Sequence, residues 1–318
     1  MRILNCHVWL RLGDELPEGD AERLGREFPN ARFSVELKPD DHSSVDIIFT
    51  RSRLPDETTV QLPSLKWIHT TYGGGLSFLT PHVASQGIAV TCSRGVQAHP
   101  LSEYAEACVL ALAKKFPLLS EFKQARRWDE TLALDTLSGK VVGLLGLGAV
   151  GSAVAQRLHK QEMKVRAIRR NVNQVPPYVE SVCGMEGLDG ILSEADFLIV
   201  GLPPIPGIQG LIGEGQLRSM KTTSHLINLV TRGIVDDEAL ARALREGWIA
   251  GAACNVFGAN PLPTTSPLWD APNLIISPNI AQTDPLRWSK LRNVFTENLK
   301  RHLRGEALAN RVDGQGAY

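Results

Sequence analysis

The sequence predicts an α/β fold made of two doubly wound parallel-sheet domains. Its 318 residues suit two domains at roughly 100–200 residues each. Short apolar segments alternate with helical patterns along most of the chain, which is typical of parallel strands joined by crossover helices. Apolar residues make up 43% of the composition, enough to fill two hydrophobic cores.

The first part of the chain contains a strand-and-helix series that ends near residue 95. The predicted strands are Arg2–Leu4, Arg32–Leu37, Asp46–Thr50, Lys66–Thr70 and Ile88–Thr91, with a helix around Gly19–Phe28. Three consecutive glycines at 73–75 follow the fourth strand and predict a tight loop.

A long helical pattern follows at Leu101–Arg127, and its apolar residues lie on most faces. Such a helix is buried between layers, and Pro117 is expected to break or kink it.

A second alternating series starts near Lys140. Its predicted strands are Val141–Leu145, Lys164–Ile168, Phe197–Leu202, His225–Leu229, Ala250–Val256 and Leu274–Ser277. Its predicted helices are Ser152–Lys160 and Asp236–Glu246, and a last helix starts after Asp284-Pro285 and runs to about Arg304.

Charge and cysteine content restrict the partners. Lys plus Arg and Asp plus Glu both number 34, so the net charge of zero argues against nucleic-acid or membrane-surface partners, which need a basic face. Five widely spaced cysteines without a C-x-x-C pattern predict neither a disulfide framework nor a metal site. Reduced thiols, no signal peptide and no apolar stretch of about 18 residues favour a cytoplasmic protein.

The turn after the strand Val141–Leu145 has the pattern G-x-G-x-x-G. It consists of Gly146, Leu147, Gly148, Ala149, Val150 and Gly151 and opens a helix. The first glycine permits the tight turn, the second lets the backbone approach a pyrophosphate, and the third allows close helix–strand packing. We therefore predict a nicotinamide-dinucleotide site at this helix N-terminus, with a plain strand–helix turn as the alternative.

The next strand ends in arginine where an NAD-binding domain has an acid. Arg169 stands there, 18 residues after Gly151, and Arg170 follows it. An acid would repel a 2′-phosphate, whereas guanidinium groups bind one through charge-assisted hydrogen bonds. This indicates NADP(H) as the preferred cofactor, with NAD(H) still possible; the alternative is that both arginines are solvated surface charges.

Several further segments resemble the D-isomer-specific 2-hydroxyacid dehydrogenase family, especially its glyoxylate/hydroxypyruvate reductase branch. They include the segments at 65–68, 100–103, 227–236, 261–263, 266–269 and 310–318, together with the glycine turn. The resemblance spans nearly the whole chain.

The resemblance implies an architecture. Residues 1–95 plus 285–318 would form a flavodoxin-like substrate domain, and residues 96–284 an inserted Rossmann-like NAD(P)-binding domain. The active site would lie in a cleft between them, and the protein would form a homodimer through the nucleotide domain.

The resemblance also implies reduction of a small 2-oxo acid to a D-2-hydroxy acid. Arg232 matches the arginine that binds the substrate carboxylate and carbonyl oxygen. Its planar guanidinium group suits a planar carboxylate next to a ketone. Tyr72, Gly73 and Gly74 match the loop whose backbone N–H groups hold the carboxylate. The predicted cofactor contacts are Gly146, Gly148, Ala149, Val150, Gly151, Arg169, Arg170, Leu202, Pro203, Pro204, Val230, Thr231, Arg232 and Asn255. The alternatives are structural roles: Arg232 would form a surface salt bridge, and the Tyr72 loop would be a turn that only contributes to packing.

Three positions depart from the family pattern. Asn279 stands where the family has the histidine that delivers a proton, and Asn260 where it has the glutamate that orients this histidine. Asn255 stands where it has an acid opposite the nicotinamide carboxamide. Asparagine can donate a hydrogen bond but cannot transfer a proton at accessible pH.

Other residues are candidates for the missing acid. Tyr72, His69 and His99 lie near the predicted site, although each is more often a packing or hydrogen-bonding residue; His225 is expected to be structural. Three hypotheses therefore stand: a reductase with an altered proton path at Arg232, Asn260 and Asn279, an enzyme whose reaction needs no proton relay, and a non-catalytic NADP(H) sensor or interaction protein.

Overall fold

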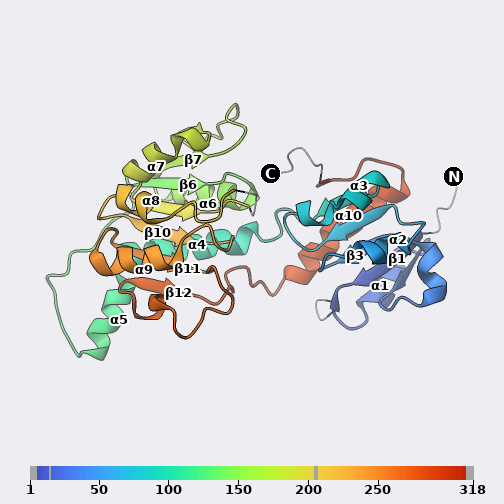
Figure 1. The fold of residues 1–318 in the computed structure, drawn as a ribbon, viewed down its shortest axis with the longest axis horizontal. Helices are drawn as coiled ribbons and strands as arrows, with labels where there is room; N and C mark the ends of the chain where they lie inside the picture. The colour runs from blue at the N-terminus through green and yellow to red at the C-terminus, as the bar shows by residue number, and fades with distance from the viewer. Residues whose placement is uncertain (1–5, 14–15, 204–206, 313–318) are drawn as a thin grey trace. The chain divides into compact units, whose positions relative to one another are not determined.

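The computed structural model describes residues 6–13, 16–203 and 207–312 (Figure 1). The chain divides into two compact units. Unit 1 comprises Met1–Gln97 and Asp284–Tyr318, and unit 2 comprises Ala98–Thr283.

Unit 1 contains a five-stranded sheet in the order β2-β1-β3-β4-β5, and every neighbouring pair is parallel. The strands are β1 (Cys6–Arg11), β2 (Ala31–Ser34), β3 (Val45–Thr50), β4 (Trp67–Thr70) and β5 (Ala89–Cys92). This order is that of a flavodoxin-like doubly wound sheet, in which the chain reverses direction across the sheet after its second strand.

The helices of unit 1 cover both faces of its sheet. They are α1 (Asp20–Glu27), η2 (Pro39–Ser44), α2 (Asp56–Val60), η3 (Leu76–Phe78), α3 (Pro81–Ser85) and α10 (Arg287–Leu303). Successive residues of β3 face opposite sides of the sheet. Phe49 packs in the core that α1 and α10 cover, and Ile48 packs in the core on the side of α2 and α3. Phe295 of α10 stacks on Phe49 at 4.5 Å and on Trp67 at 5.4 Å, so the C-terminal helix is part of this core.

Unit 2 contains a seven-stranded parallel sheet in the order β12-β11-β10-β9-β6-β7-β8. The strands are β6 (Val141–Leu145), β7 (Lys164–Ile168), β8 (Ser181–Cys183), β9 (Phe197–Val200), β10 (His225–Asn228), β11 (Gly251–Cys254) and β12 (Leu274–Ile276). The order reverses between β6 and β9, as in a Rossmann-like sheet, and ligands bind at the carboxyl ends of strands beside such a switch point.

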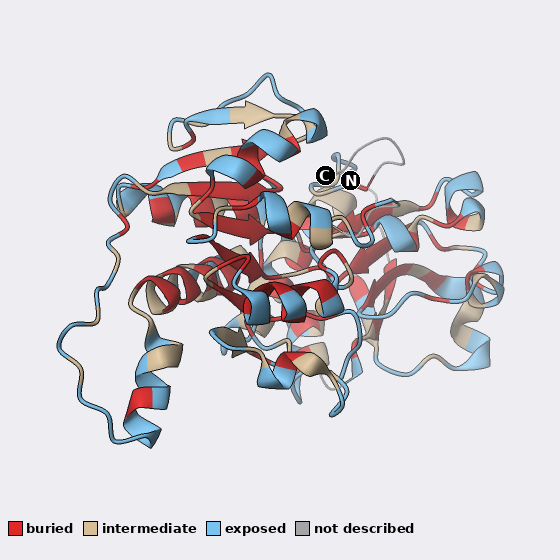
Figure 2. Cartoon of the chain, turned by 60° about the vertical axis from the view of Figure 1, so that its left-hand side comes forward, coloured by how far each residue is buried: buried red, intermediate tan, exposed pale blue. Residues whose placement is uncertain are grey.

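Two helical layers enclose this sheet. The helices of unit 2 are α4 (Ala98–Ala113), α5 (Phe116–Gln124), α6 (Ala149–Lys160), η4 (Met185–Gly187), α7 (Leu188–Glu194), α8 (Glu214–Ser219), α9 (Asp237–Glu246) and η5 (Pro267–Asp270). Phe197 and Ile199 face the layer of α4 and α6, whereas Leu198 and Val200 face that of α7, α8 and α9. The five inner strands are accordingly buried throughout most of their length, whereas the edge strands β8 and β12 are exposed or only partly buried (Figure 2).

The predicted fold class, two parallel-sheet α/β domains, is confirmed, with corrections to single elements. The predicted strand Arg2–Leu4 lies outside the described residues, and the first described strand is instead β1, which the sequence analysis missed. The helical stretch predicted at Leu101–Arg127 starts three residues earlier, at Ala98, and divides into α4 and α5 near Pro117, where a break or kink was expected; Lys115 has a φ of 52°, and Pro117 lies in the first turn of α5. The short strand β8 was also not predicted.

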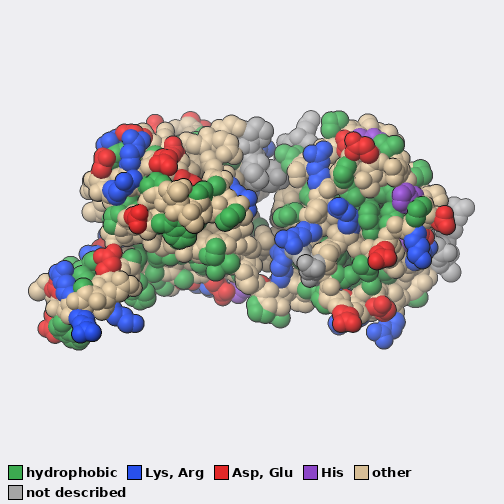
Figure 3. Space-filling view, turned by 60° about the horizontal axis from the view of Figure 1, so that its bottom comes forward, with side chains coloured by type: hydrophobic (Ala, Val, Ile, Leu, Met, Phe, Trp, Pro, Cys, Tyr) green, Lys and Arg blue, Asp and Glu red, His purple; other side chains and the backbone are tan. Residues whose placement is uncertain are grey.

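The length of the helices, the grouping of possible metal ligands, the cysteines and the surface charges bear on what the chain can bind. Among the described residues, no helix is both long and apolar enough to cross a membrane, and no three His, Cys, Asp or Glu residues are grouped so that they could hold a metal ion. All five cysteines are free thiols. Positive and negative side chains are interspersed on the face seen in Figure 3.

Candidate cofactor and substrate site

The predicted site residues of unit 2 follow the carboxyl ends of six strands. Asn279 follows β12, Asn255 and Asn260 follow β11, Arg232 follows β10, Leu202 follows β9, the glycine turn follows β6 and Arg169 follows β7. Because all neighbouring strands are parallel, these carboxyl ends share one edge of the sheet. The fold thus collects residues from a span of more than 130 positions in a single row.

The glycine turn is tightly constrained at its first and last residue. Gly146 has a φ of 105°, a conformation that side chains rarely adopt, and a Cβ there would lie 2.9 Å from the Gly201 carbonyl oxygen. A Cβ on Gly151 would lie 2.0 Å from the Gly146 carbonyl oxygen. Both glycines are therefore required by the protein's own packing.

Gly148 differs, and it provides a test of whether the turn fits a dinucleotide. Its φ of −82° suits any residue, and a Cβ would meet no protein atom within 4 Å. Neither strain nor packing explains this glycine, whereas close approach of a phosphate does. Gly148 is also the N-cap of α6 and has no side chain to cap it, so no side chain satisfies the first N–H groups of this 12-residue helix, which suits the binding of an anion there.

Arg169 lies beside the glycine turn. The backbone N–H of Gly146 donates to the carbonyl oxygen of Ile168 at 3.1 Å, and Arg169 is the next residue. In the part of the chain that the structure describes, neither Arg169 nor Arg170 forms an ion pair, although Arg166 on the same strand pairs with Glu180 at 2.9 Å. Among the described residues, both arginines thus lack an anionic partner, and they directly follow the residue that is bonded to the turn.

Arg232 is exposed in the loop that follows β10. The loop is fixed at both sides: the Thr231 hydroxyl donates to the carbonyl oxygen of Leu202 at 2.5 Å, and Gly233 has a φ of 72°. This bond links the predicted cofactor residues Val230 and Thr231 to Leu202 and Pro203. Pro204, also predicted to bind the cofactor, lies outside the described residues.

The three asparagines of interest have different surroundings. Asn260 is exposed, and Asn279 is half-buried with a φ of 56°, a left-handed conformation that asparagine tolerates well. Asn255 is only 1% exposed, and its amide is bonded to four protein groups.

The predicted substrate loop lies in unit 1, after β4. Tyr72 is 46% exposed, and its carbonyl oxygen accepts a bond of 2.8 Å from the N–H of Ser93. The Cys92 thiol donates to the carbonyl oxygen of Gly73 at 3.4 Å. The end of β5 therefore holds the loop Tyr72–Gly74 in place. Burial raises the pKa of Cys92, an effect that the nearby Arg94 opposes.

The histidines considered as proton donors have structural environments. His69 is fully buried, its ring nitrogens lie 2.6 Å from the Thr91 hydroxyl and 3.1 Å from that of Ser93, and burial lowers its pKa to about 3. It is therefore neutral near pH 7 and not a general acid. His225 stacks on Phe197 at 5.0 Å at the amino end of β10, away from the site, as expected.

His99 is bound in an ionic cluster. It lies 3.1 Å from a Glu103 oxygen and 3.4 Å from Arg157, which also pairs with Glu106 at 3.0 Å. Arg157 is nine residues after Gly148, about 13 Å along α6 from its N-terminus. The cluster joins α4 to the far half of α6.

Three residues escaped the sequence analysis: Tyr104, Asn228 and Ser277. Ser277 forms a hydrogen bond with Asn255, Tyr104 forms one with Ser277, and Asn228 forms one with the carbonyl oxygen of Val256. Asn228 and Ser277 gave a local signal in the sequence, because each is the first polar residue after an apolar run that predicts a strand.

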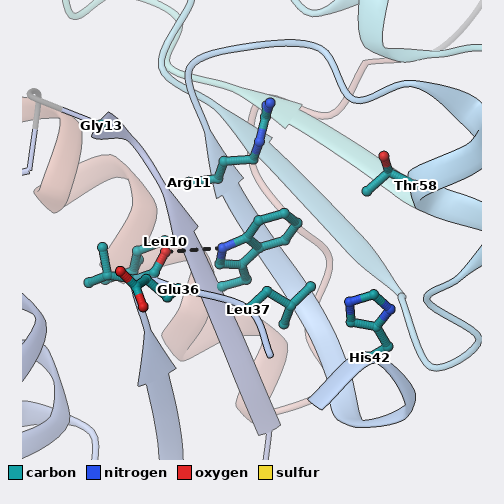
Figure 4. A pocket seen from close by; sticks show the side chains of 9 residues that line it. Leu10, Arg11, Gly13, Glu36, Leu37, His42 and Thr58 are labelled. Atoms are coloured by element: carbon teal, nitrogen blue, oxygen red, sulfur yellow. Dashed lines mark hydrogen bonds between the residues drawn. The ribbon is translucent and has the colours of Figure 1, made fainter. Parts of the chain in front are cut away.

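A separate open pocket of about 560 Å³ lies on unit 1 near Trp9, Arg11 and His42 (Figure 4). The Trp9 indole N–H donates to the carbonyl oxygen of Val35 at 3.2 Å. None of the predicted site residues lines it.

Comparison with known proteins gives a consistent result. Residues 107–281 match the sequence model of the D-isomer specific 2-hydroxyacid dehydrogenase NAD binding domain. The predicted nicotinamide-dinucleotide-binding domain is thereby confirmed.

Similar proteins extend the match to nearly the whole chain. A glyoxylate reductase of Thermofilum pendens is 31% identical over 90% of this chain and 86% of that protein. A glyoxylate reductase of Korarchaeum cryptofilum is 32% identical over 94% of both chains. A D-isomer specific 2-hydroxyacid dehydrogenase of Xanthobacter autotrophicus Py2, solved with NADPH and MES, is 27% identical with a TM-score of 0.82, covering 98% of this chain and 99% of that one.

Proposed function

The chain belongs to the D-isomer specific 2-hydroxyacid dehydrogenase family, and from this premise we propose that it is an NADP-dependent oxidoreductase that transfers hydride between NADPH and a small 2-oxo or 2-hydroxy acid. The observation that carries the proposal is the shared carboxyl edge of unit 2. Arg232, the glycine turn and Arg169 follow β10, β6 and β7 along that edge.

The cofactor site uses two kinds of contact. The N–H groups at the start of α6 and the bare backbone at Gly148 bind the pyrophosphate, while Arg169 and Arg170 bind a 2′-phosphate. The NADPH complex of the similar Xanthobacter autotrophicus structure supports NADP over NAD. The cofactor, when bound, supplies the hydride.

Arg232 binds the substrate, because its planar fork matches a carboxylate next to a ketone. In this proposal Tyr72, Gly73 and Gly74 of unit 1 give backbone N–H groups to the same carboxylate. The predicted division into a substrate domain (1–95 plus 285–318) and a cofactor domain (96–284) is kept here as part of the proposal.

The proton path is altered in this proposal. Asn279 and Asn260 take the positions of the histidine and glutamate expected from the family resemblance. An asparagine amide stabilises a developing oxyanion by hydrogen bonding but cannot deliver the proton. Tyr72, exposed in the substrate loop, is the remaining candidate donor among those the sequence singled out.

Steady-state oxidation of NADPH tests the proposal. Purified protein is incubated with NADPH and glyoxylate, hydroxypyruvate or larger 2-oxo acids, and absorbance at the reduced-nicotinamide band is followed. Turnover that is lost in Arg232→Ala supports the function. Tight NADPH binding without turnover on any of these acids would contradict it and would favour a sensor.

A second candidate is a reaction without a proton relay. The neutral side chains Asn255, Asn260 and Asn279 favour it, because no group among them titrates near pH 7. It predicts a flat pH–rate profile between pH 6 and 9, whereas a reductase that depends on an acid loses rate as pH rises.

We also propose that the protein is a homodimer formed through unit 2. Helix α5 and the segment after it project from the body of this unit (Figures 1 and 2). They expose Phe116 and Leu134, and Trp128 is 87% exposed. Large apolar side chains that are exposed on a projecting segment are typical of an interface with a second copy. Light scattering should give twice the 34.8 kDa chain mass, and Trp128→Ala should shift it toward the monomer.

A further inference from the structure

Asn255 joins two loops of unit 2 through opposite ends of its amide group. The oxygen Oδ1 accepts three hydrogen bonds, from the Ser277 hydroxyl at 3.0 Å, the Ile280 N–H at 2.9 Å and the Ala281 N–H at 3.0 Å. These three donors belong to the loop that follows β12, and the loop also carries Asn279. The backbone N–H of Asn279 in turn donates to the carbonyl oxygen of Asn255 at 2.9 Å.

The nitrogen end binds the other loop. Asn255 Nδ2 donates to the carbonyl oxygen of Leu229 at 2.8 Å. Leu229 is the first residue after β10 and lies three positions before Arg232. One buried side chain thus fixes the loop of Asn279 and the loop of Arg232 at the same time.

Neighbouring groups support this arrangement. The Tyr104 hydroxyl donates to Ser277 Oγ at 2.7 Å, which leaves the Ser277 hydrogen for Asn255. Asn228, the last residue of β10, donates to the carbonyl oxygen of Val256 at 3.0 Å. A side chain at the end of β10 thus bonds to the backbone after β11, and a side chain after β11 bonds to the backbone after β10.

The bonding pattern requires an amide rather than a carboxylate. Asparagine has an acceptor at one end and a donor at the other at every accessible pH, whereas an aspartate side chain has a donor only when it is protonated. An ionised aspartate would keep the three bonds to Ser277, Ile280 and Ala281 but would place a second oxygen against the Leu229 carbonyl oxygen. The site is 1% exposed, so water cannot relieve that contact.

We infer that Asn255 is a positioning residue that holds the loops of Arg232 and Asn279 in a fixed relation, acting through them. This inference concerns the site of the proposed function, and it rests on that function only where activity is the readout. It leaves open the predicted contact of Asn255 with the cofactor.

Hydrogen exchange on the full-length protein tests the inference without any assay of activity. In Asn255→Ala, peptides covering 229–233 and 278–281 should both exchange at least about tenfold faster than in the unsubstituted protein. In Asn255→Asp, only 229–233 should exchange faster, because the bonds to Ile280 and Ala281 remain. If either variant fails to fold, Ser277→Ala, which removes one accepted bond, should accelerate only 278–281.

Asn298→Asp is the matched control. Asn298 is equally buried in unit 1, and it also uses its amide at both ends, since Nδ2 donates to the Ala309 carbonyl oxygen at 3.0 Å and Oδ1 accepts from the Ala309 N–H at 2.8 Å. Its substitution should leave the exchange of 229–233 and 278–281 unchanged. Unchanged exchange of both segments in Asn255→Ala would overturn the inference.

Kinetics give a second readout. Where the unsubstituted protein reduces a 2-oxo acid, Asn255→Asp should lower kcat about tenfold or more, whereas the control Asn298→Asp should not. An unchanged kcat would overturn the positioning role even if exchange changes. Absence of turnover in the unsubstituted protein would contradict the proposed function, and the exchange result would still decide the inference.

Discussion

The backbone N–H of Gly146 donates to the carbonyl oxygen of Ile168 at 3.1 Å, which brings the start of the glycine turn beside the residue that precedes Arg169. The glycine turn and the backbone of Arg169 are therefore adjacent at the carboxyl ends of β6 and β7. A cofactor bound as proposed would contact both.

Arg169→Ala should weaken NADPH binding far more than NADH binding. Loss of charge-assisted hydrogen bonds to a 2′-phosphate costs about 1.5–3 kcal/mol, which is roughly a 10- to 100-fold rise in Kd. Titration of protein fluorescence with both cofactors measures the ratio. Arg166→Ala is the control, because Arg166 lies on the same strand but pairs with Glu180. An equal loss for NADPH and NADH would contradict the assignment.

Gly148→Ala should separate binding from stability. A Cβ there meets no protein atom within 4 Å, so the free energy of unfolding should change by no more than about 0.5 kcal/mol. The added methyl group would occupy space next to the phosphates, and NADPH affinity should fall. Gly151→Ala should instead destabilise the fold by about 1–3 kcal/mol, because its Cβ would lie 2.0 Å from the Gly146 carbonyl oxygen. Denaturant unfolding and NADPH titration of both variants check this pair, and equal destabilisation would refute it.

Arg232→Lys should retain NADPH binding and lose substrate recognition. Lysine keeps the positive charge but cannot form the two parallel hydrogen bonds of a guanidinium group, so kcat/KM for a 2-oxo acid should fall about 10- to 100-fold. Steady-state kinetics with saturating NADPH measure the change. A lysine variant as active as the unsubstituted protein would show that Arg232 does not bind the carboxylate.

The double substitution Asn279→His with Asn260→Glu should create a general acid. A positioned proton donor contributes about 10²–10⁴ in rate, so reduction of 2-oxo acids should rise by up to that factor. Because the donor must be protonated, the new activity should fall as pH rises through the histidine pKa. Asn279→His alone should gain less. No gain in the double variant would indicate that another group already supplies the proton.

His225→Phe should reduce the loss of stability in acid. Burial lowers the pKa of His225 from 6.5 to about 4, so between those pH values the unfolded chain binds a proton that the folded chain does not. Stability is therefore lost as pH falls from 6.5 toward 4, by up to about 3 kcal/mol. Phenylalanine cannot titrate and retains stacking on Phe197. Urea unfolding at pH 7 and pH 4.5 should show a smaller difference for the variant; an equal difference would contradict the assignment.

Much of the fold follows from local patterns. The strands Val141–Leu145 and Lys164–Ile168 were predicted with the bounds that the structure shows, because an apolar run between turn residues is a strong signal. The fold class followed from the alternation of such runs with helices. The division into α4 and α5 was only partly foreseen, since the backbone reversal at Lys115 has no local signature comparable to Pro117.

The sequence by itself determined the glycine turn, the arginines after the second strand of unit 2 and the residue types at each strand end, because these depend on neighbours along the chain. The tertiary structure decided which of them share an edge, and that Gly148 has room for a Cβ where Gly146 and Gly151 do not. It also decided that His69 is fully buried and neutral near pH 7, and that Asn255 binds two loops at once. Strand order and the hydrogen bonds between loops arise from contacts between residues distant in sequence, and such contacts leave no periodic pattern in the sequence that would predict them.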